Sequence, residues 1–237
     1  GGAVRDYMLH RRSNDFDIAT NALPADIIKI FGPSYKTIQY GCYNMRIGSY
    51  NVDITTYRKE EAYEGRNPSK ITYTNNLLLD AERRDFTINA FYMNRNEEII
   101  DLYDGQKDIK RKMIRAIGNP TTRVREDPLR ILRAVRFASI YKFSLEKNLA
   151  NAIKRDKKML NELSLTRIKK ELDGILLANG FTLLRQLNLL KELQITTKSI
   201  VYVNDLSGLW AQIKTEVEYP QTKSLKMRQK NIEELLK

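Results

Sequence analysis

Two aspartates two residues apart form the part of the sequence best suited to chemistry, in the stretch Asp15-Phe16-Asp17-Ile18. Side chains alternate between the two faces of an extended strand, so Asp15 and Asp17 share a face and the two apolar residues share the other. Neighbouring carboxylates repel each other unless a cation lies between them, and magnesium prefers oxygen ligands of this kind. A solvated acidic edge strand is the simpler interpretation, because a D-x-D pattern alone is short and common.

Asp53 adds a third carboxylate. The run over residues 51–57 alternates like a strand, which places Asp53 on one face and the apolar side chains on the other. Taken alone, Asp53 is as compatible with a solvated strand face as with a metal site. The chain has one cysteine, Cys42, and one histidine, His10, so a catalytic metal has to be held by carboxylates, which favours magnesium or manganese over zinc.

Gly1 and Gly2 stand directly before a predicted helix over residues 3–10. Backbone amides of glycine can approach a phosphate closely, and a helix N-terminus favours anions. A simple turn is the commoner meaning of a glycine pair. Because such a pair is expected to follow a strand, we expect the natural chain to begin upstream of Gly1.

Arginines cluster with acidic and amide side chains in a second stretch. Residues 83–90 are predicted to form a helix with Asp85 and Asn89 one turn apart on one face. Arg84 beside them supplies positive charge, and the group suits a phosphate or ribose hydroxyls. Surface ion pairing is the alternative for an isolated helix.

A third stretch begins a helix-rich second half. Glu126-Asp127-Pro128 is typical of a helix start, with proline at the first helical position. Asp127 is then either a helix cap or a ligand-binding acid, and the sequence leaves both open. Arg130, Arg133 and Arg136 repeat every three residues and predict one cationic stripe along this helix.

The composition favours a polyanionic partner. The 237 residues carry 41 Lys and Arg against 29 Asp and Glu, a formal net charge of +12, and nucleic acid is the leading candidate, with simple solubility as the alternative. No apolar run approaches the roughly 20 residues of a membrane span. A single cysteine excludes an internal disulfide and fits a reducing compartment. We therefore expect a cytoplasmic protein with no membrane partner.

Short strands are predicted for the first half of the chain and helices for the second. The predicted strands cover residues 15–19, 36–39, 44–47, 51–57 and 98–102, and the middle three form an antiparallel sheet. A helix over residues 25–31 is expected to bury Ile27, Ile28, Ile30 and Phe31. Residues 59–70 are predicted to be a mobile loop able to act as a lid, and residues 104–105 a tight turn into a connector that ends at residue 116. Further helices are predicted over residues 145–153, 166–177 and 181–193, and Trp210 and residues 223–237 indicate additional ordered structure.

Several motifs occur together in a fixed order: GGAVRD, DFDIAT, ITTYR, RRDFTINA, DLYDGQKDI, EDPLRILRAVRFA and LTRIKKEL. In this order and spacing the sequence resembles the class II tRNA nucleotidyltransferases, or CCA-adding enzymes, and the related bacterial poly(A) polymerases. The resemblance covers about residues 1–180, and the ordered set is specific although each motif is weak.

The resemblance implies an α+β fold with three parts. Residues 1–116 are expected to be a polymerase-β-like nucleotidyltransferase head with a mixed or antiparallel sheet, the catalytic part. Residues 117–180 are expected to be an all-helical neck that recognises the nucleotide base, and residues 181–237 a shortened helical body and tail that contacts tRNA.

The resemblance also implies roles for single residues. Asp15 and Asp17 would bind two magnesium ions, and Asp53 would be the third catalytic carboxylate, which aligns the primer hydroxyl. Asp127 and Arg130 would bind the base, because a carboxylate accepts from an exocyclic amine and an arginine donates to a ring nitrogen or carbonyl; cytosine and adenine satisfy this pair and uracil does not. The remaining residues implied are Gly1, Gly2, Arg5, Arg84, Asp85 and Asn89 for the triphosphate and ribose, and Arg133 and Arg136 for phosphate or RNA.

The function implied is template-independent addition of C, C and A to tRNA 3′ ends from CTP and ATP. The charged loop over residues 59–70 favours complete CCA addition, and the absence of an arginine-rich Gly-Arg-Arg-Phe element favours tRNA as the substrate. Thr166 replaces a glutamate of the family pattern, which predicts the loss of one ion pair in the neck and looser base selection. The alternatives are a poly(A) polymerase, an enzyme that adds only CC or only A, and a catalytically inactive RNA-binding protein of the same fold.

Overall fold

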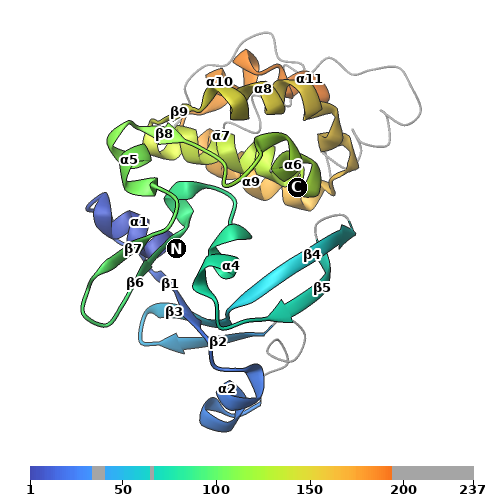
Figure 1. Cartoon of the computed structure of the whole chain (residues 1–237). Coiled ribbons are helices and arrows are strands. Elements are labelled where there is room, and N and C mark those ends of the chain that lie inside the picture. The colour runs from blue at the N-terminus through green and yellow to red at the C-terminus, as the bar shows by residue number, and fades with distance from the viewer. Residues whose placement is uncertain (34–40, 65–66, 194–237) are drawn as a thin grey trace. The chain divides into compact units, whose positions relative to one another are not determined.

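The computed structural model describes residues 1–33, 41–64 and 67–193 (Figure 1). The chain divides into two compact units. We call residues 1–111 and 115–119 the head unit, and residues 112–114 together with those from 120 onward the helical unit. The α+β fold class is confirmed, whereas the predicted domain limits at residues 116 and 180 stay predictions.

A three-stranded sheet forms the centre of the head unit, in the order β1-β3-β2. Strand β1 (Asp15–Thr20) runs parallel to β3 (Tyr50–Thr56), and β2 (Cys42–Ile47) runs antiparallel to β3. The sheet is therefore mixed, which is one of the two forms expected for the head, and the antiparallel pairing predicted for residues 44–47 and 51–57 is confirmed. The strand predicted over residues 36–39 lies outside the described residues.

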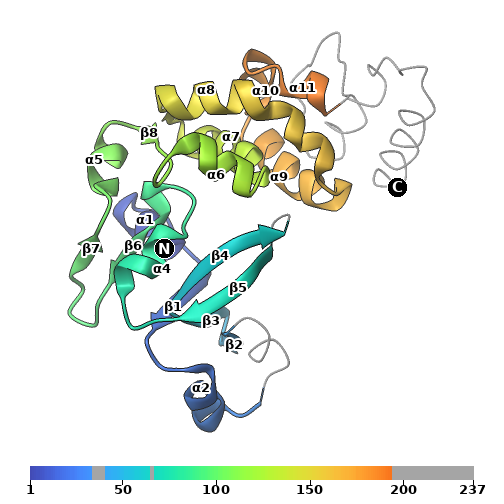
Figure 2. The same ribbon diagram turned by 45° about the vertical axis from the view of Figure 1, so that its right-hand side comes forward.

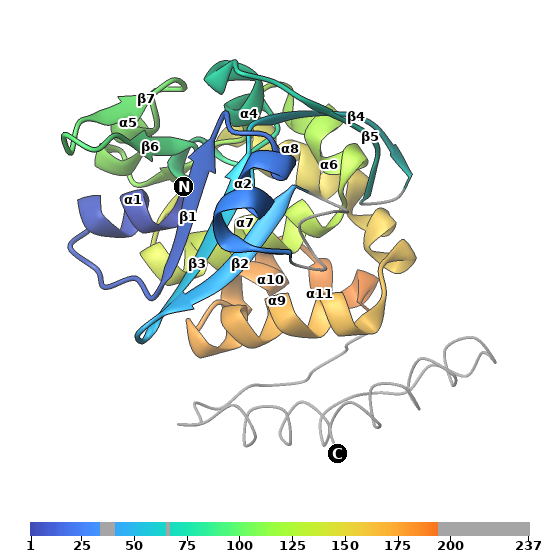
Figure 3. The same cartoon turned by 90° about the horizontal axis from the view of Figure 1, so that it is seen from below.

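One face of this sheet carries the small apolar core of the region. Helix α2 (Pro24–Phe31) lies over the strands (Figure 3) and buries Ile27 against Val52 and Ile54. Ile30 and Phe31 were expected in this core, but they are 72% and 42% exposed. A helix of this length presents one face to a sheet, and these two side chains lie outside that face.

A hairpin of β4 (Arg58–Glu64) and β5 (Asn67–Tyr73) follows the sheet, as Figure 2 shows. The prediction of a mobile loop over residues 59–70 was wrong for the described residues. Both strands are rich in charged and polar residues, so the alternation of apolar and polar residues that indicates a half-buried strand is missing. The register pairs Arg58 with Tyr73 and Lys59 with Thr72.

The RRDFTINA segment is not the helix that was predicted over residues 83–90. Helix α4 (Leu77–Glu82) ends before it, Phe86 has extended backbone angles, and a single 3-10 turn η1 (Thr87–Asn89) follows. Phe86, Thr87, Ile88 and Asn89 are all buried. A helix at the edge of a core buries only one face, so four consecutive buried residues favour an irregular segment enclosed on all sides.

The rest of the head unit surrounds this segment. Helix α1 (Gly2–Met8) opens the chain, and β6 (Phe91–Met93) pairs antiparallel with β7 (Ile99–Asp101). The tight turn predicted at residues 104–105 instead begins helix α5 (Gly105–Lys110). A Cβ atom on Gly105 would lie 2.5 Å from the Thr87 carbonyl oxygen, so this helix start requires glycine.

The helical unit contains α6 (Pro120–Glu126), α7 (Leu129–Tyr141), α8 (Lys147–Asp156), η2 (Lys157–Glu162), α9 (Leu165–Leu177), α10 (Phe181–Gln186) and α11 (Leu189–Glu192). A short parallel pair, β8 (Met113–Ile114) and β9 (Ser144–Leu145), completes it. The helix predicted over residues 181–193 is divided, because Asn188 has a left-handed backbone with φ of 57°. Trp210 and residues 223–237 lie outside the described residues.

Fully buried aliphatic side chains from successive helices form the core of this unit: Leu129, Ile131, Leu132, Leu149, Ile153, Leu160 and Ile175. Helices α7 and α9 make its most extensive helix–helix contact. No helix within the described residues is long and apolar enough to cross a membrane.

Candidate active site

The strand register brings the three predicted carboxylates to one face of the sheet. In the parallel pairing of β1 with β3, Asp17 lies opposite Asp53 and Asp15 lies opposite Asn51. Val52 and Ile54, which flank Asp53, are buried on the core side, so Asp53 projects from the other face. Residues paired across neighbouring strands project to the same face, and Asp15 and Asp17 therefore share it with Asp53.

Two asparagines that the sequence analysis missed bind these carboxylates. The Asn51 side-chain amide donates to Asp15 Oδ1 at 2.8 Å, and the Asn44 amide donates to Asp53 Oδ1. Asn44 lies opposite Asp53 in the pairing of β2 with β3. A correct register would have identified both asparagines, but the sequence alone did not supply it.

The carboxylates fit a divalent cation by the chemistry of their oxygen atoms. Asp15 and Asp17 are both exposed, so an ion can reach them from solvent. No group of three or more acidic, histidine or cysteine side chains within the described residues forms a complete cage. In many magnesium sites the protein contributes only one or two carboxylates, and substrate phosphate and water supply the other ligands.

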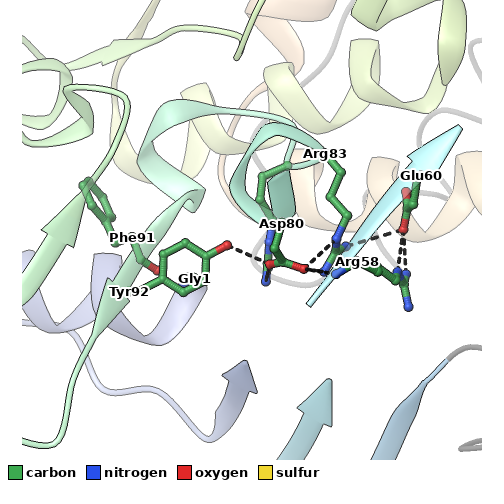
Figure 4. A network of polar contacts seen from close by, with 8 residues as sticks. Gly1, Arg58, Glu60, Asp80, Arg83, Phe91 and Tyr92 are labelled. Atoms are coloured by element: carbon green, nitrogen blue, oxygen red, sulfur yellow. Dashed lines mark hydrogen bonds and ion pairs between the residues drawn. The ribbon is translucent and has the colours of Figure 1, made fainter. Parts of the chain in front are cut away.

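Gly1 and Arg84 lie beside Asp17. A Cβ atom built on Gly1 would lie 3.4 Å from Arg84 Nη1 and 3.4 Å from Asp17 Oδ2. The Gly1 nitrogen donates to the Phe91 carbonyl, which holds this backbone against β6 (Figure 4). Burial alone would lower the pKa of Arg84, but Tyr92, Asp80 and Asp17 raise it, so a fixed positive charge lies next to the carboxylates.

Arg5 is buried and bound within the head unit. Its guanidinium donates twice to Asp6 at 3.0 Å and once to the Asn89 side-chain oxygen. The Asn89 amide donates in turn to Asp85 Oδ1 at 2.9 Å. Asp85 and Asn89 are thus in contact, as expected, although a 3-10 turn rather than a helix brings them together. The predicted contact of Arg5 with a triphosphate stays a prediction.

Asp127 and Arg130 lie at the start of α7 in the helical unit, and both are buried. Asp127 Oδ1 accepts from the Leu129 amide at 3.2 Å, which is the capping contact that the sequence left open. Arg130 donates to Glu126 Oε2 at 2.9 Å and to the Arg123 carbonyl at 2.8 Å. Helix α6 and its neighbour α7 therefore fix both side chains in place.

Arg133 and Arg136, which were predicted to belong to one cationic stripe with Arg130, have the same two partners. Both pair with Glu171 of α9, at 3.8 and 3.2 Å, and both guanidiniums lie over the Phe137 ring. Glu171 is only 4% exposed and was missed, although it belongs to the LTRIKKEL motif. Thr166 is exposed, and its expected effect on base selection stays a prediction.

The head unit thus combines a mixed three-stranded sheet with a face that carries three aspartates, and a helical unit follows it in the chain. Residues 1–115 match the family model for the poly A polymerase head domain. The chain is a relative of the class II tRNA nucleotidyltransferases, so the resemblance inferred from its motifs is confirmed.

Curated relatives and solved structures support this relationship. The chain is 46% identical over 173 residues to the CCA-adding enzyme of Lactobacillus delbrueckii subsp. bulgaricus, covering 72% of this chain and 44% of that protein. It is 41% identical over 182 residues to the CCA-adding enzyme of Limosilactobacillus reuteri, covering 76% of this chain and 45% of that protein. The chain thus spans less than half the length of these relatives.

Among solved structures, the CCA-adding enzyme of Bacillus stearothermophilus in complex with CTP matches with a TM-score of 0.77 at 30% identity. This match covers 99% of the chain and 62% of that protein. A tRNA nucleotidyltransferase complexed with a primer tRNA and an incoming ATP analog matches with a TM-score of 0.66 at 28% identity, over 81% of the chain and 57% of that protein.

Proposed function

We propose that this chain carries a template-independent tRNA nucleotidyltransferase that adds C, C and A to tRNA 3′ ends from CTP and ATP. The observation that carries the proposal is the carboxylate face of the sheet, where Asp17 lies opposite Asp53 and beside Gly1 and Arg84. The names of the relatives supply the substrates: CCA-adding enzymes by sequence, and complexes with CTP, with a primer tRNA and with an ATP analog by structure.

The fold family implies dependence on a divalent metal, and we propose two magnesium ions held by Asp15 and Asp17. When bound, such ions stabilise negative charge on the attacking and leaving oxygens of an in-line displacement. The primer 3′ hydroxyl gives up its proton to solvent and attacks the α-phosphorus, the bond from the α-phosphorus to the oxygen that bridges to the β-phosphate breaks, and pyrophosphate leaves. In this step Asp53 orients the hydroxyl, and Arg84 with the Gly1 and Gly2 amides holds the triphosphate.

Base selection is proposed to belong to Asp127 and Arg130. A buried carboxylate that accepts from an exocyclic amine selects cytosine and adenine, and a buried guanidinium donates to their ring nitrogen or carbonyl. Arg130 belongs to α7 and Asp127 accepts from the amide of its first residue, Leu129, which supports selection by protein side chains without a template strand. Asp85 and Asn89 are proposed to bind the ribose.

Residues 59–70, whose presence favoured complete CCA addition, form most of the β4–β5 hairpin. We therefore propose complete CCA addition instead of addition of CC only. We place the reaction in the cytoplasm, which agrees with the single cysteine and the expected tRNA partner.

The proposal is tested by nucleotide incorporation. The protein, magnesium and a tRNA transcript that lacks its last three nucleotides are incubated with CTP alone, ATP alone, or both, and product lengths are read on a sequencing gel. We expect two additions with CTP alone and three with both nucleotides. Long A tails on any RNA would identify a poly(A) polymerase instead, and no incorporation would favour an inactive RNA-binding protein.

A further inference from the structure

Asp80 of α4 is a buried carboxylate to which the proposed reaction gives no role. Its exposed fraction is 1%, and donors from three elements surround it (Figure 4). Asp80 Oδ1 accepts from the Arg58 amide at 3.2 Å and from Arg83 Nη2 at 2.9 Å. Asp80 Oδ2 accepts from the Tyr92 hydroxyl at 2.7 Å and from Arg84 Nη2 at 3.4 Å.

Asp80 also balances the charge of two neighbouring guanidiniums. Burial alone would raise the pKa of this carboxyl, but Arg83, Arg84 and the Tyr92 hydroxyl lower it overall, so it is ionised at neutral pH. Burial and the nearby Arg84 both lower the pKa of Arg83, which shows that the two cations disfavour each other. A neutral side chain at position 80 would leave the Arg83 and Arg84 guanidiniums buried side by side without the negative charge that offsets their repulsion.

The two arginines held by Asp80 lead to different parts of the head unit. Arg84 Nη1 lies by the Gly1 backbone and Asp17, on the carboxylate side. Arg83 Nη1 lies 3.6 Å from Glu60 Oε1, and Glu60 also pairs with Arg58 at 2.7 Å. Glu60 and Arg58 both belong to the hairpin strand β4, so Arg83 is linked to that strand. Asp80 therefore connects the start of the hairpin to the arginine beside the candidate metal ligand.

We propose that Asp80 is a positioning residue for nucleotide binding, which fixes the Arg84 guanidinium toward the triphosphate while it anchors the first residue of the β4–β5 hairpin. This inference rests on the proposed function, because it assumes that Arg84 meets the nucleotide. It predicts that loss of the Asp80 charge weakens nucleotide binding through Arg84, beyond any loss of stability.

The first test compares Asp80→Asn with Asp108→Asn. Asp108 is also a buried head-unit carboxylate bound by one arginine, Arg115, and one hydroxyl, that of Thr87, so its variant reports the stability cost of losing such a charge. Thermal unfolding, the Kd for CTP with magnesium, and KM and kcat for CTP are measured for both variants. We expect both to unfold at lower temperature, but only Asp80→Asn to raise the Kd and KM for CTP, by about tenfold.

A double-mutant cycle with Arg84→Ala separates positioning from general damage. If Asp80 acts through Arg84, the double variant binds CTP no more weakly than Arg84→Ala alone. Additive losses, or equal effects of Asp80→Asn and Asp108→Asn on the Kd for CTP, would overturn the inference. A wild-type protein that neither binds CTP nor extends tRNA would instead refute the proposed function itself.

Tyr92→Phe tests the positioning role of Asp80 if the Asp80→Asn variant does not fold. It removes the hydroxyl that donates to Asp80 Oδ2 and keeps the ring, and we expect the Kd for CTP to rise about threefold. Its matched control is Tyr43→Phe, whose hydroxyl donates to the Phe31 carbonyl at 2.8 Å on an exposed part of the head unit. Equal Kd values for the two tyrosine variants would also contradict a positioning role.

Discussion

Carboxylates that share a strand face repel each other, and the head unit offsets this repulsion with donors placed by the strand register. Asn51 donates to Asp15 from the neighbouring strand β3, and Asn44 donates to Asp53 from β2. Arg84 supplies positive charge next to Asp17. These neighbours hold the three carboxylates on one face of the sheet and supply part of the charge compensation there.

Asp17 is therefore the residue whose loss is expected to be most damaging to catalysis. Asp17→Ala should lower nucleotide incorporation by at least about a hundredfold, because the proposed metal ion would lose a protein ligand. The negative charge that develops on the phosphate oxygens would then be stabilised less. Incorporation is measured with CTP and a tRNA that lacks CCA, and tRNA binding is measured in parallel and should stay nearly unchanged. The control is Asp104→Ala, an exposed head-unit aspartate paired with Lys107. Activity of Asp17→Ala near that of the control would mean that the metal site is elsewhere.

One substitution can separate the base-recognition role proposed for Asp127 from its contact with the Leu129 amide. Asparagine caps a helix about as well as aspartate, so Asp127→Asn should unfold within about 0.5 kcal/mol of the wild type. Asparagine can also donate a hydrogen bond, so the preference for CTP over UTP should fall by about tenfold. Competition between the two nucleotides on one tRNA measures this ratio. An unchanged ratio with unchanged stability would leave Asp127 as a helix cap only.

At the scale of elements, the pairing of α7 with α9 organises the helical unit. Glu171 of α9 binds Arg133 and Arg136 of α7, and a Cβ atom on Gly174 would lie 2.6 Å from Arg136 Cδ. Near the C-terminal end of α9, a Cβ atom on Gly180 would lie 2.0 Å from the Ser139 hydroxyl of α7. Small residues thus let the chain around α9 approach α7 closely.

Gly180→Ala is expected to disturb this close approach and destabilise the protein by about 2 kcal/mol, because overpacking displaces buried side chains. Urea denaturation measures the change. Ser139→Ala removes the hydroxyl that the new methyl group would meet and should restore part of the loss when the two substitutions are combined. A single variant as stable as the wild type, or a double variant less stable than Gly180→Ala, would show that this contact does not limit packing.

The central strands could be predicted because apolar and polar residues alternate along them. Segments in which every residue is buried, or in which most residues are polar, lack this alternation and were not predicted correctly. Strands β1 and β3 were expected from residues 15–19 and 51–57, and the period of two placed Asp15 and Asp17 on one face of their strand. The strand register, which the sequence did not supply, adds Asp53 to that face. The β4–β5 hairpin was missed because β4 is rich in charged residues and β5 begins with polar residues and a proline. Glu171 and Asp80 were missed because long-range partners define their roles, and sequence spacing does not show such partners.

At the scale of the whole molecule, two properties bear on the proposed binding of tRNA: the net charge of the chain and its length relative to its relatives. The net charge of +12 favours a polyanion, and part of the positive charge is used internally, as in Arg83, Arg84, Arg133 and Arg136. The chain spans less than half of the length of its curated relatives. Activity on tRNA is therefore the property of this chain that most needs measurement.

The proposed CCA addition is measured most directly as the 3′-terminal sequence of a tRNA transcript lacking CCA after incubation with the protein, magnesium, CTP and ATP. An unstructured RNA of equal length is treated in parallel. The proposed function predicts products that end in CCA and stop there on the tRNA, with little addition to the unstructured RNA. Equal extension of both RNAs, or A-only tails on the tRNA, would contradict it.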